Sequence, residues 1–102
     1  MRVNLQANET VLKAADTRHY INDMKVLGKL ILTNQRLYFT TIETENGRVI
    51  LELEPRAISE VYEFNNRMLF PNGLCLLTHD GRELKFEIKK RNTWAQMIAR
   101  II

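Results

Sequence analysis

The segment 28–39, with the sequence Gly-Lys-Leu-Ile-Leu-Thr-Asn-Gln-Arg-Leu-Tyr-Phe, constrains the fold more than any other part of the chain. Two apolar runs flank a polar interruption at 33–36 that is only long enough for a turn. The apolar and aromatic residues of both runs favour strands, and Asn34 tolerates the unusual backbone angles of a tight connection. The segment therefore predicts a β-hairpin.

Short strands are expected along most of the remaining chain. Before the hairpin, the sequence predicts a strand at 11–15 and then a long loop at 16–25, where no clear period is seen. After the hairpin, it predicts strands at 49–53, 58–64, 74–78 and 83–88, tight turns at 46–47 (Asn-Gly) and 79–82, and a second loop at 65–73.

The last predicted strand alternates between apolar and charged residues. We expect Leu84, Phe86 and Ile88 to face the core, and the charged residues between and after them, Lys85, Glu87 and Lys89, to face water.

The hydrophobic period then changes from that of a strand to that of a helix. Trp94, Met97, Ile98 and Ile101 follow the spacing i, i+3, i+4, i+7, which predicts an amphipathic helix at 93–102. Its start carries a capping-box sequence, Thr93 with Gln96.

These elements predict a mainly β fold. Seven strands form a curled antiparallel barrel or sandwich, and the C-terminal helix caps its open end. Trp94 is expected to fill the core, with Leu32, Phe39 or Phe86 among its neighbours.

Length and composition indicate one domain spanning 1–102, with 45% apolar residues. The one cysteine, Cys75, lies in an apolar run, which favours a buried thiol in a reducing compartment, so we expect a cytoplasmic protein. The first twenty residues lack the apolar stretch of a signal peptide, and no run is long enough to cross a bilayer.

The charge and the chemical groups argue against several functions. The net charge of +3, from 15 basic and 12 acidic residues, gives no global field that indicates nucleic acid as partner. Cys75 and His79 would lie about 13 Å apart along a strand, too far to share a metal ion. With only two histidines and no phosphate-binding glycine loop, we expect no enzyme, no metal and no cofactor.

Residues 28–39 resemble the hairpin Gly-x-Leu-x-Leu-Thr-Asn-x-Arg-Leu-x-Phe of GRAM domains, a branch of the pleckstrin-homology superfold. The run Ile58-Ser59-Glu60-Val61 and the hairpin Asp80-Gly81-Arg82 with Phe86 are similar too, so the resemblance covers residues 9 to 100. It implies this fold and a non-catalytic module that docks lipid headgroups or protein segments.

The resemblance also implies a headgroup site at the first, third and sixth inter-strand loops, here 16–27, 43–48 and 79–82. The basic residues of these loops are Arg18, Lys25, Arg48 and Arg82, and the acidic ones are Asp16, Asp23, Glu43, Glu45 and Asp80. Four cations against five anions give no positive field, so we expect a weak site that binds soluble inositol phosphates poorly.

Two other segments are candidate binding sites. Lys89, Lys90 and Arg91 precede the helix, where they could form an anion or headgroup site or could simply be a solvated strand end. The loop residues Arg67, Met68, Leu69 and Phe70 could contact a membrane or a protein partner, or fold back over the core. Tyr20 and Ile21 are further candidate contacts.

The sequence thus predicts a cytoplasmic binding module. Recruitment to another protein or self-association is the leading interpretation. A small homo-oligomer that uses an exposed strand edge is a structural alternative. Peripheral binding to acidic membrane lipids or phosphoinositides is the alternative.

Overall fold

The computed structural model describes residues 6–21, 24–41, 49–66 and 70–102. Within them seven antiparallel strands form one sheet, followed by one helix. In chain order the elements are β1 Val11–Ile21, β2 Met24–Thr33, β3 Leu37–Thr41, β4 Val49–Leu53, a 3-10 turn η1 Pro55–Ala57, β5 Ile58–Asn66, β6 Phe70–Thr78, β7 Glu83–Glu87 and α1 Arg91–Ala99.

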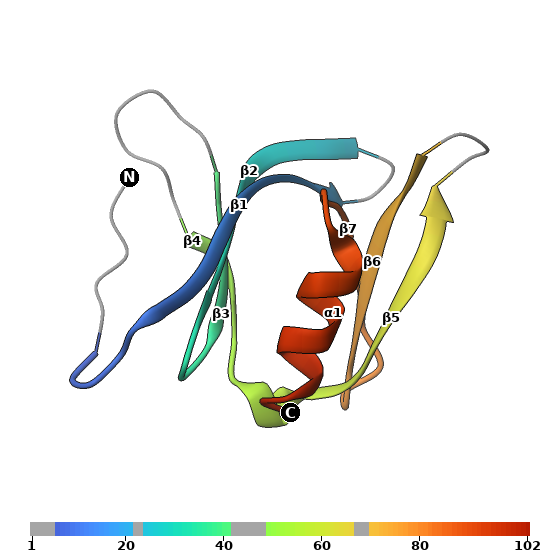
Figure 1. Cartoon of the computed structure of the whole chain (residues 1–102). Helices are drawn as coiled ribbons and strands as arrows, with labels where there is room; N and C mark the ends of the chain where they lie inside the picture. The colour runs from blue at the N-terminus through green and yellow to red at the C-terminus, as the bar shows by residue number, and fades with distance from the viewer. Residues whose placement is uncertain (1–5, 22–23, 42–48, 67–69) are drawn as a thin grey trace.

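The sheet is curled, and the helix lies in its hollow. The strand order is β4-β3-β2-β1-β7-β6-β5, so β1 joins the N-terminal half of the sheet to the C-terminal half. Figure 1 shows α1 between the two halves, and its contacts fall mainly on β5 and β6. The expected mainly β fold, a curled sheet closed by a C-terminal helix, is confirmed.

The predicted hairpin is β2 and β3, with Leu30 opposite Phe39. Its turn is held by the Thr33 hydroxyl, which accepts the backbone N–H groups of Gln35 at 3.1 Å and Arg36 at 3.0 Å. Asn34 does not adopt a positive φ; its side chain instead accepts the N–H of Thr10 at 2.8 Å. The turn therefore depends on side-chain hydrogen bonds rather than on a left-handed residue.

The loop expected at 16–25 is wrong, because β1 continues to Ile21 and β2 begins at Met24. Two polar residues that point inward, Thr17 and His19, break the apolar alternation by which a strand is predicted from sequence. Thr17 donates its hydroxyl to the carbonyl oxygen of Glu87, and His19 Nδ1 lies 2.9 Å from the carbonyl oxygen of Lys85. The His19 ring also stacks on Phe86 at 4.4 Å between centroids. Partners that are distant in the sequence thus satisfy the polar side chains that made this segment look like a loop.

The second expected loop, 65–73, is also too long, because β5 reaches Asn66 and β6 begins at Phe70. Residues 67–69 and the turn expected at 46–47 lie outside the described residues.

The capping box at Thr93 and Gln96 is wrong as well. The helix begins at Arg91, and the residue before it, Lys90, turns the chain with a left-handed conformation at φ 57° and no side-chain cap. Thr93 therefore already lies inside the first helical turn.

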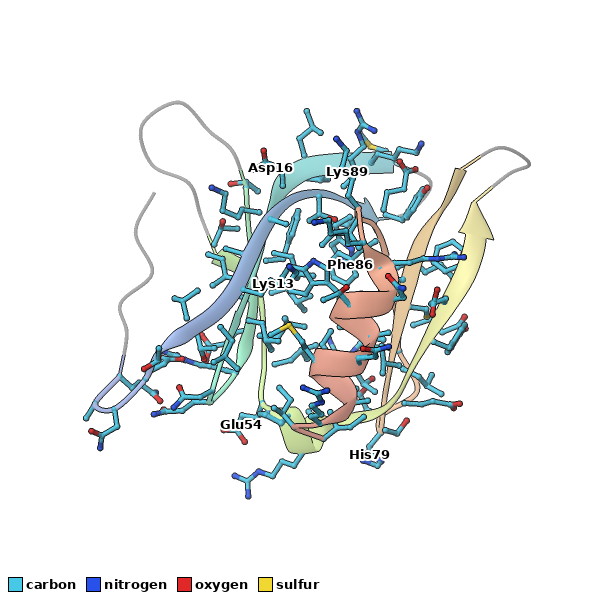
Figure 2. The ribbon with its side chains drawn as sticks, viewed as in Figure 1. Lys13, Asp16, Glu54, His79, Phe86 and Lys89 are labelled. Carbon is cyan, nitrogen blue, oxygen red and sulfur yellow. The ribbon has the colours of Figure 1, made fainter. Side chains whose placement is uncertain are left out.

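The helix presents the predicted face to the core. Trp94 and Ile98 are fully buried, and Met97 and Ile101 are partly buried against the same core. Trp94 belongs to one apolar cluster with Leu32, Phe39 and Phe86, as the sequence predicted. Figure 2 shows Phe86 pointing into the hollow that α1 closes.

Because Trp94 is the largest side chain in this cluster, we expect Trp94→Ala to lower the free energy of unfolding by about 3 to 5 kcal/mol. Chemical denaturation measures this change. Gln96→Ala, at an exposed position of the same helix, is the control and should change stability by less than about 0.5 kcal/mol. Equal losses of unfolding free energy in the two variants would contradict the role of Trp94 in filling the core between the sheet and the helix.

The N-terminal segment is attached to the hairpin by an ion pair that is shielded from solvent. Arg36 donates from Nε and Nη2 to the two carboxylate oxygens of Glu9, each at 2.8 Å, and Thr33 donates to the same carboxylate at 2.6 Å. The Arg36 guanidinium outweighs the opposing effect of burial and lowers the pKa of Glu9 to about 2.

This lowered pKa predicts acid-sensitive stability. The contribution of Glu9 is complete above its usual pKa of 4.5 and is lost as the pH falls toward 2, since protonation removes the charge that Arg36 binds. Thermal melts across this range should show that Glu9→Gln melts well below wild type at pH 7, with the gap closing below pH 4.5. Glu54→Gln, which removes an exposed carboxylate, should give a small and constant gap. A Glu9→Gln gap that does not change with pH would contradict the assignment.

Candidate functional site

Charged side chains of β1, β2 and β7 lie together on the outer face of the sheet, at the end of the molecule where α1 begins. Arg18 lies opposite Leu27 on β2 and Glu87 on β7, and Tyr20 lies opposite Lys25 and Lys85. Directly opposed residues of antiparallel strands point to the same side of a sheet. The neighbouring inward positions, such as Phe86, are buried, so this row of side chains faces outward.

We call this surface the basic face and define it by Arg18, Lys25, Lys29, Lys85 and Lys89. Its two carboxylates are Asp16, which lies 4.0 Å from Lys29, and Glu87. The next outward carboxylate on β7, Glu83, lies beyond this row and accepts the Tyr62 hydroxyl at 2.8 Å. Among the residues that the structure describes, five cations and two carboxylates leave the basic face positive.

An apolar side chain is exposed among these cations. Leu27 is 57% exposed on the basic face. Met24, 68% exposed where β2 begins, alternates with Lys25 and so belongs to the other side of the strand. Exposed apolar groups next to cations are typical of surfaces that contact the interface of a membrane or a protein partner.

Glu87 is the buried centre of the basic face. Sequence alternation placed it in water, but it is only 8% exposed. Lys25 Nζ lies 2.7 Å from Oε2 and Arg18 Nη1 lies 3.4 Å from Oε1, while the Tyr20 hydroxyl also donates to Oε2. Burial opposes ionisation, yet hydrogen bonds from Lys25 and Tyr20 outweigh it and lower the pKa of Glu87. The carboxylate is therefore charged, and Lys25, Arg18 and Tyr20 are among the groups that hold it.

A groove of about 480 Å³ opens beside this cluster, where β7 leaves β1 and turns into the helix. It is lined by residues 15–18, 27–28 and 87–89, and so includes Arg18, Leu27 and Lys89. In Figure 2, Asp16 and Lys89 lie at this end of the molecule, and His79 lies at the other.

The residues predicted for the inter-strand loops do not form one site. Arg18 and Lys25 lie on strands and meet at Glu87. Arg82 lies in the β6–β7 turn, which is placed beside η1 because His79 donates its N–H to the carbonyl oxygen of Ala57 at 3.0 Å. There Arg82 pairs with Asp80 at 3.1 Å. Arg48 lies outside the described residues.

The three cations before the helix have different surroundings. Lys89 is exposed and lines the groove, and Lys90 is the exposed N-cap residue. Arg91 is mostly buried: its Nε lies 2.9 Å from Oε1 of Glu63, and its Nη1 donates to the carbonyl oxygens of Phe64 and Gly73. Only Lys89 of the three joins the basic face.

The apolar candidates are placed in part. Tyr20 is half-buried, with Lys25 Nζ 5.4 Å from its ring centroid, and Ile21 ends β1 in a half-buried position. Arg67, Met68 and Leu69 lie outside the described residues, as does the side chain of Phe70.

Two cations of the basic face, Lys29 and Lys85, were missed as site residues. Strand alternation already placed Lys85 outward and does the same for Lys29. The register of β1, which brings both beside Arg18 and Lys25, was the missing information.

The described residues offer little for chemistry. They contain no group of three His, Cys, Asp or Glu side chains placed to hold a metal ion. Cys75 is free and buried, and burial raises the pKa of its thiol. None of the helices in the described ranges has the length and apolar character needed to cross a membrane.

The contacts of Arg91 predict a structural role for this residue. Arg91→Ala removes donors from two backbone carbonyls and a partner from Glu63, so we expect the free energy of unfolding to fall by about 1 to 3 kcal/mol. Lys89→Ala, at an exposed neighbour, should change it by less than about 0.5 kcal/mol. Denaturant unfolding compares them, and equal effects would show that Arg91 does not fix the start of α1.

No model of a known protein family matches the sequence, and no curated protein matches it. Solved structures with similar folds are found at low sequence identity. The C-terminal domain of an unknown protein from Leishmania infantum is 17% identical with a TM-score of 0.77, over 92% of this chain and 84% of that one. The Vps36 N-terminal PH domain is 20% identical with a TM-score of 0.74, over 96% and 82%.

The Slm1 PH domain in complex with inositol 4-phosphate is 12% identical with a TM-score of 0.71, over 90% of this chain and 97% of that one. Two of these three neighbours are PH domains, and they share the seven-stranded antiparallel sheet with a C-terminal helix. The chain therefore has the PH-like fold.

Proposed function

We propose that this chain is a non-catalytic module of the GRAM type that attaches to acidic membrane surfaces in the cytoplasm through its basic face. The observation that carries the proposal is that, among the described residues, five cations and two carboxylates lie on one face, beside exposed Leu27.

Physical chemistry connects this surface to an acidic bilayer. Each Lys or Arg near a negatively charged membrane surface contributes about 1 kcal/mol of attraction, and exposed apolar side chains add burial at the interface. Lys29, Lys85 and Lys89 lie on an open face, where lipid headgroups can approach them together. Membrane binding thus involves both the cations and the exposed apolar surface of the basic face.

The structural neighbours support an anionic ligand. The Slm1 PH domain has been solved in complex with inositol 4-phosphate and with phosphoserine, and its ligand binding is described in a non-canonical site. By analogy, phosphate-bearing lipids are the ligand class proposed for this chain.

A protein partner or a second copy of the chain is the second candidate. The observation that favours it is the open order of the sheet, in which β4 and β5 form the two ends. Such edges can pair with a strand of another chain. Strand pairing would not depend on the lipid composition of a vesicle, which separates the two candidates.

Vesicle co-sedimentation tests the proposal. Wild type should bind phosphatidylserine-containing vesicles, should not bind phosphatidylcholine alone, and should be released as salt is raised. Removing two cations with Lys29→Gln and Lys85→Gln should weaken binding by about 2 kcal/mol, roughly thirtyfold.

The control variant combines Arg56→Gln with Arg100→Gln. It removes the same charge from exposed positions near η1 and the C-terminus, at the end of the molecule away from the basic face (Figure 1). It should bind vesicles almost as wild type does. Equal weakening in both variants, or binding that ignores acidic lipid, would overturn the assignment to the basic face.

A further inference from the structure

We propose that Glu87 is an internal anion that fills the anion-binding centre of the basic face, so that the chain responds to the density of negative charge on a bilayer rather than to a single phosphate group. This inference rests on the proposed membrane function and names how its ligand is selected.

The donors around Glu87 form a built anion site. Lys25 Nζ at 2.7 Å, Arg18 Nη1 at 3.4 Å and the Tyr20 hydroxyl converge on two oxygen atoms that are almost hidden from solvent. Ammonium, guanidinium and hydroxyl donors are also the groups that bind phosphate oxygens. The protein's own carboxylate occupies the place where such an oxygen would sit.

The remaining cations are arranged differently. Lys29 is paired only at 4.0 Å with exposed Asp16, Lys85 Nζ lies 5.5 Å from the ring centroid of Phe64, and Lys89 has no ion-pair partner among the described residues. They come from β2, β7 and the turn after β7, and none of the carboxylates that the structure describes is shared between them. Dispersed cations attract a charged surface, whereas tight binding of one phosphate needs donors that converge on it.

An attached carboxylate is a strong competitor for an external anion. Arg18 and Lys25 are about half exposed, so a phosphate can touch their outer edges, but the donors that converge on Glu87 become available to it only if Glu87 leaves. A buried carboxylate without partners is costly. Free phosphate is therefore kept out of this centre in the wild type. A bilayer avoids the competition, because it attracts Lys29, Lys85 and Lys89 without displacing Glu87.

Neutralising Glu87 should open the centre. Glu87→Gln keeps the size and an oxygen that accepts a hydrogen bond, while the charges of Arg18 and Lys25 become available. Glu60→Gln is the matched control. Glu60 is exposed on β5, so this substitution removes the same charge at a position away from the cluster.

The experiment titrates inorganic phosphate against chloride at matched ionic strength, following melting temperature and heat of binding. The Glu87→Gln variant should show saturable stabilisation by phosphate, whereas wild type and Glu60→Gln should show none. Adding Arg18→Gln to Glu87→Gln should abolish the effect. On phosphatidylserine vesicles, Glu87→Gln should bind roughly fivefold more tightly than wild type, and Glu60→Gln should bind as wild type does.

The outcomes separate the inference from the proposed function. Saturable phosphate binding by wild type, or the same gain in Glu60→Gln as in Glu87→Gln, overturns the inference. Phosphate binding that appears only in Glu87→Gln supports it, even if wild type fails to bind vesicles and the membrane proposal falls. If Glu87→Gln does not fold, Glu87→Asp retracts the carboxylate by one methylene; partial phosphate binding by this variant supports the inference, and its absence overturns it.

Discussion

The structure depends on the double pairing of β1, which bonds to β2 along its length and to β7 over Arg18–Tyr20. Both faces of this strand reinforce the junction with β7. Inward, Thr17 and His19 bond to the β7 backbone; outward, Arg18 and Tyr20 bond to the Glu87 side chain. Because β1 is the link between the two halves of the sheet, this junction encloses Trp94 and also positions the basic face.

Elements whose causes are local could be predicted from the sequence. The hairpin of β2 and β3 follows from two apolar runs around a polar turn, and the buried side of α1 follows from the spacing of Trp94 and Ile98. The second half of β1 could not be predicted, because the partners of Thr17 and His19 lie 70 and 66 residues away in the chain. A polar residue reads as exposed until the partner that satisfies it is known.

The candidate site was harder to predict for the same reason. Counting charges by loop grouped Arg18 and Lys25 with Arg82, which the fold places beside η1. Because residues 16–25 were predicted to form a loop, no strand was expected to pair with Lys29 on the β1 side. Its position opposite Asp16 on the outer face was therefore not predicted. Strand alternation correctly exposed Lys85 and Lys89 but put Glu87 in water, since alternation cannot report that cations from two other strands cover a side chain.

Glu87 links the positive charge of this surface to the stability of the fold. Arg18 and Lys25 are about half exposed, at 54% and 48%, so their ion pairs alone add little stability. Glu87 is 8% exposed, and a buried carboxylate that loses its partners is strongly destabilising. Loss of either cation leaves the other in place, whereas loss of both removes the two cations that lie against this carboxylate at the junction of β1 and β7. Part of the positive charge of the basic face therefore also has a structural role, because it pairs with Glu87. Lys29, Lys85 and Lys89 have no buried carboxylate partner among the described residues, so their charges can change with less effect on the fold.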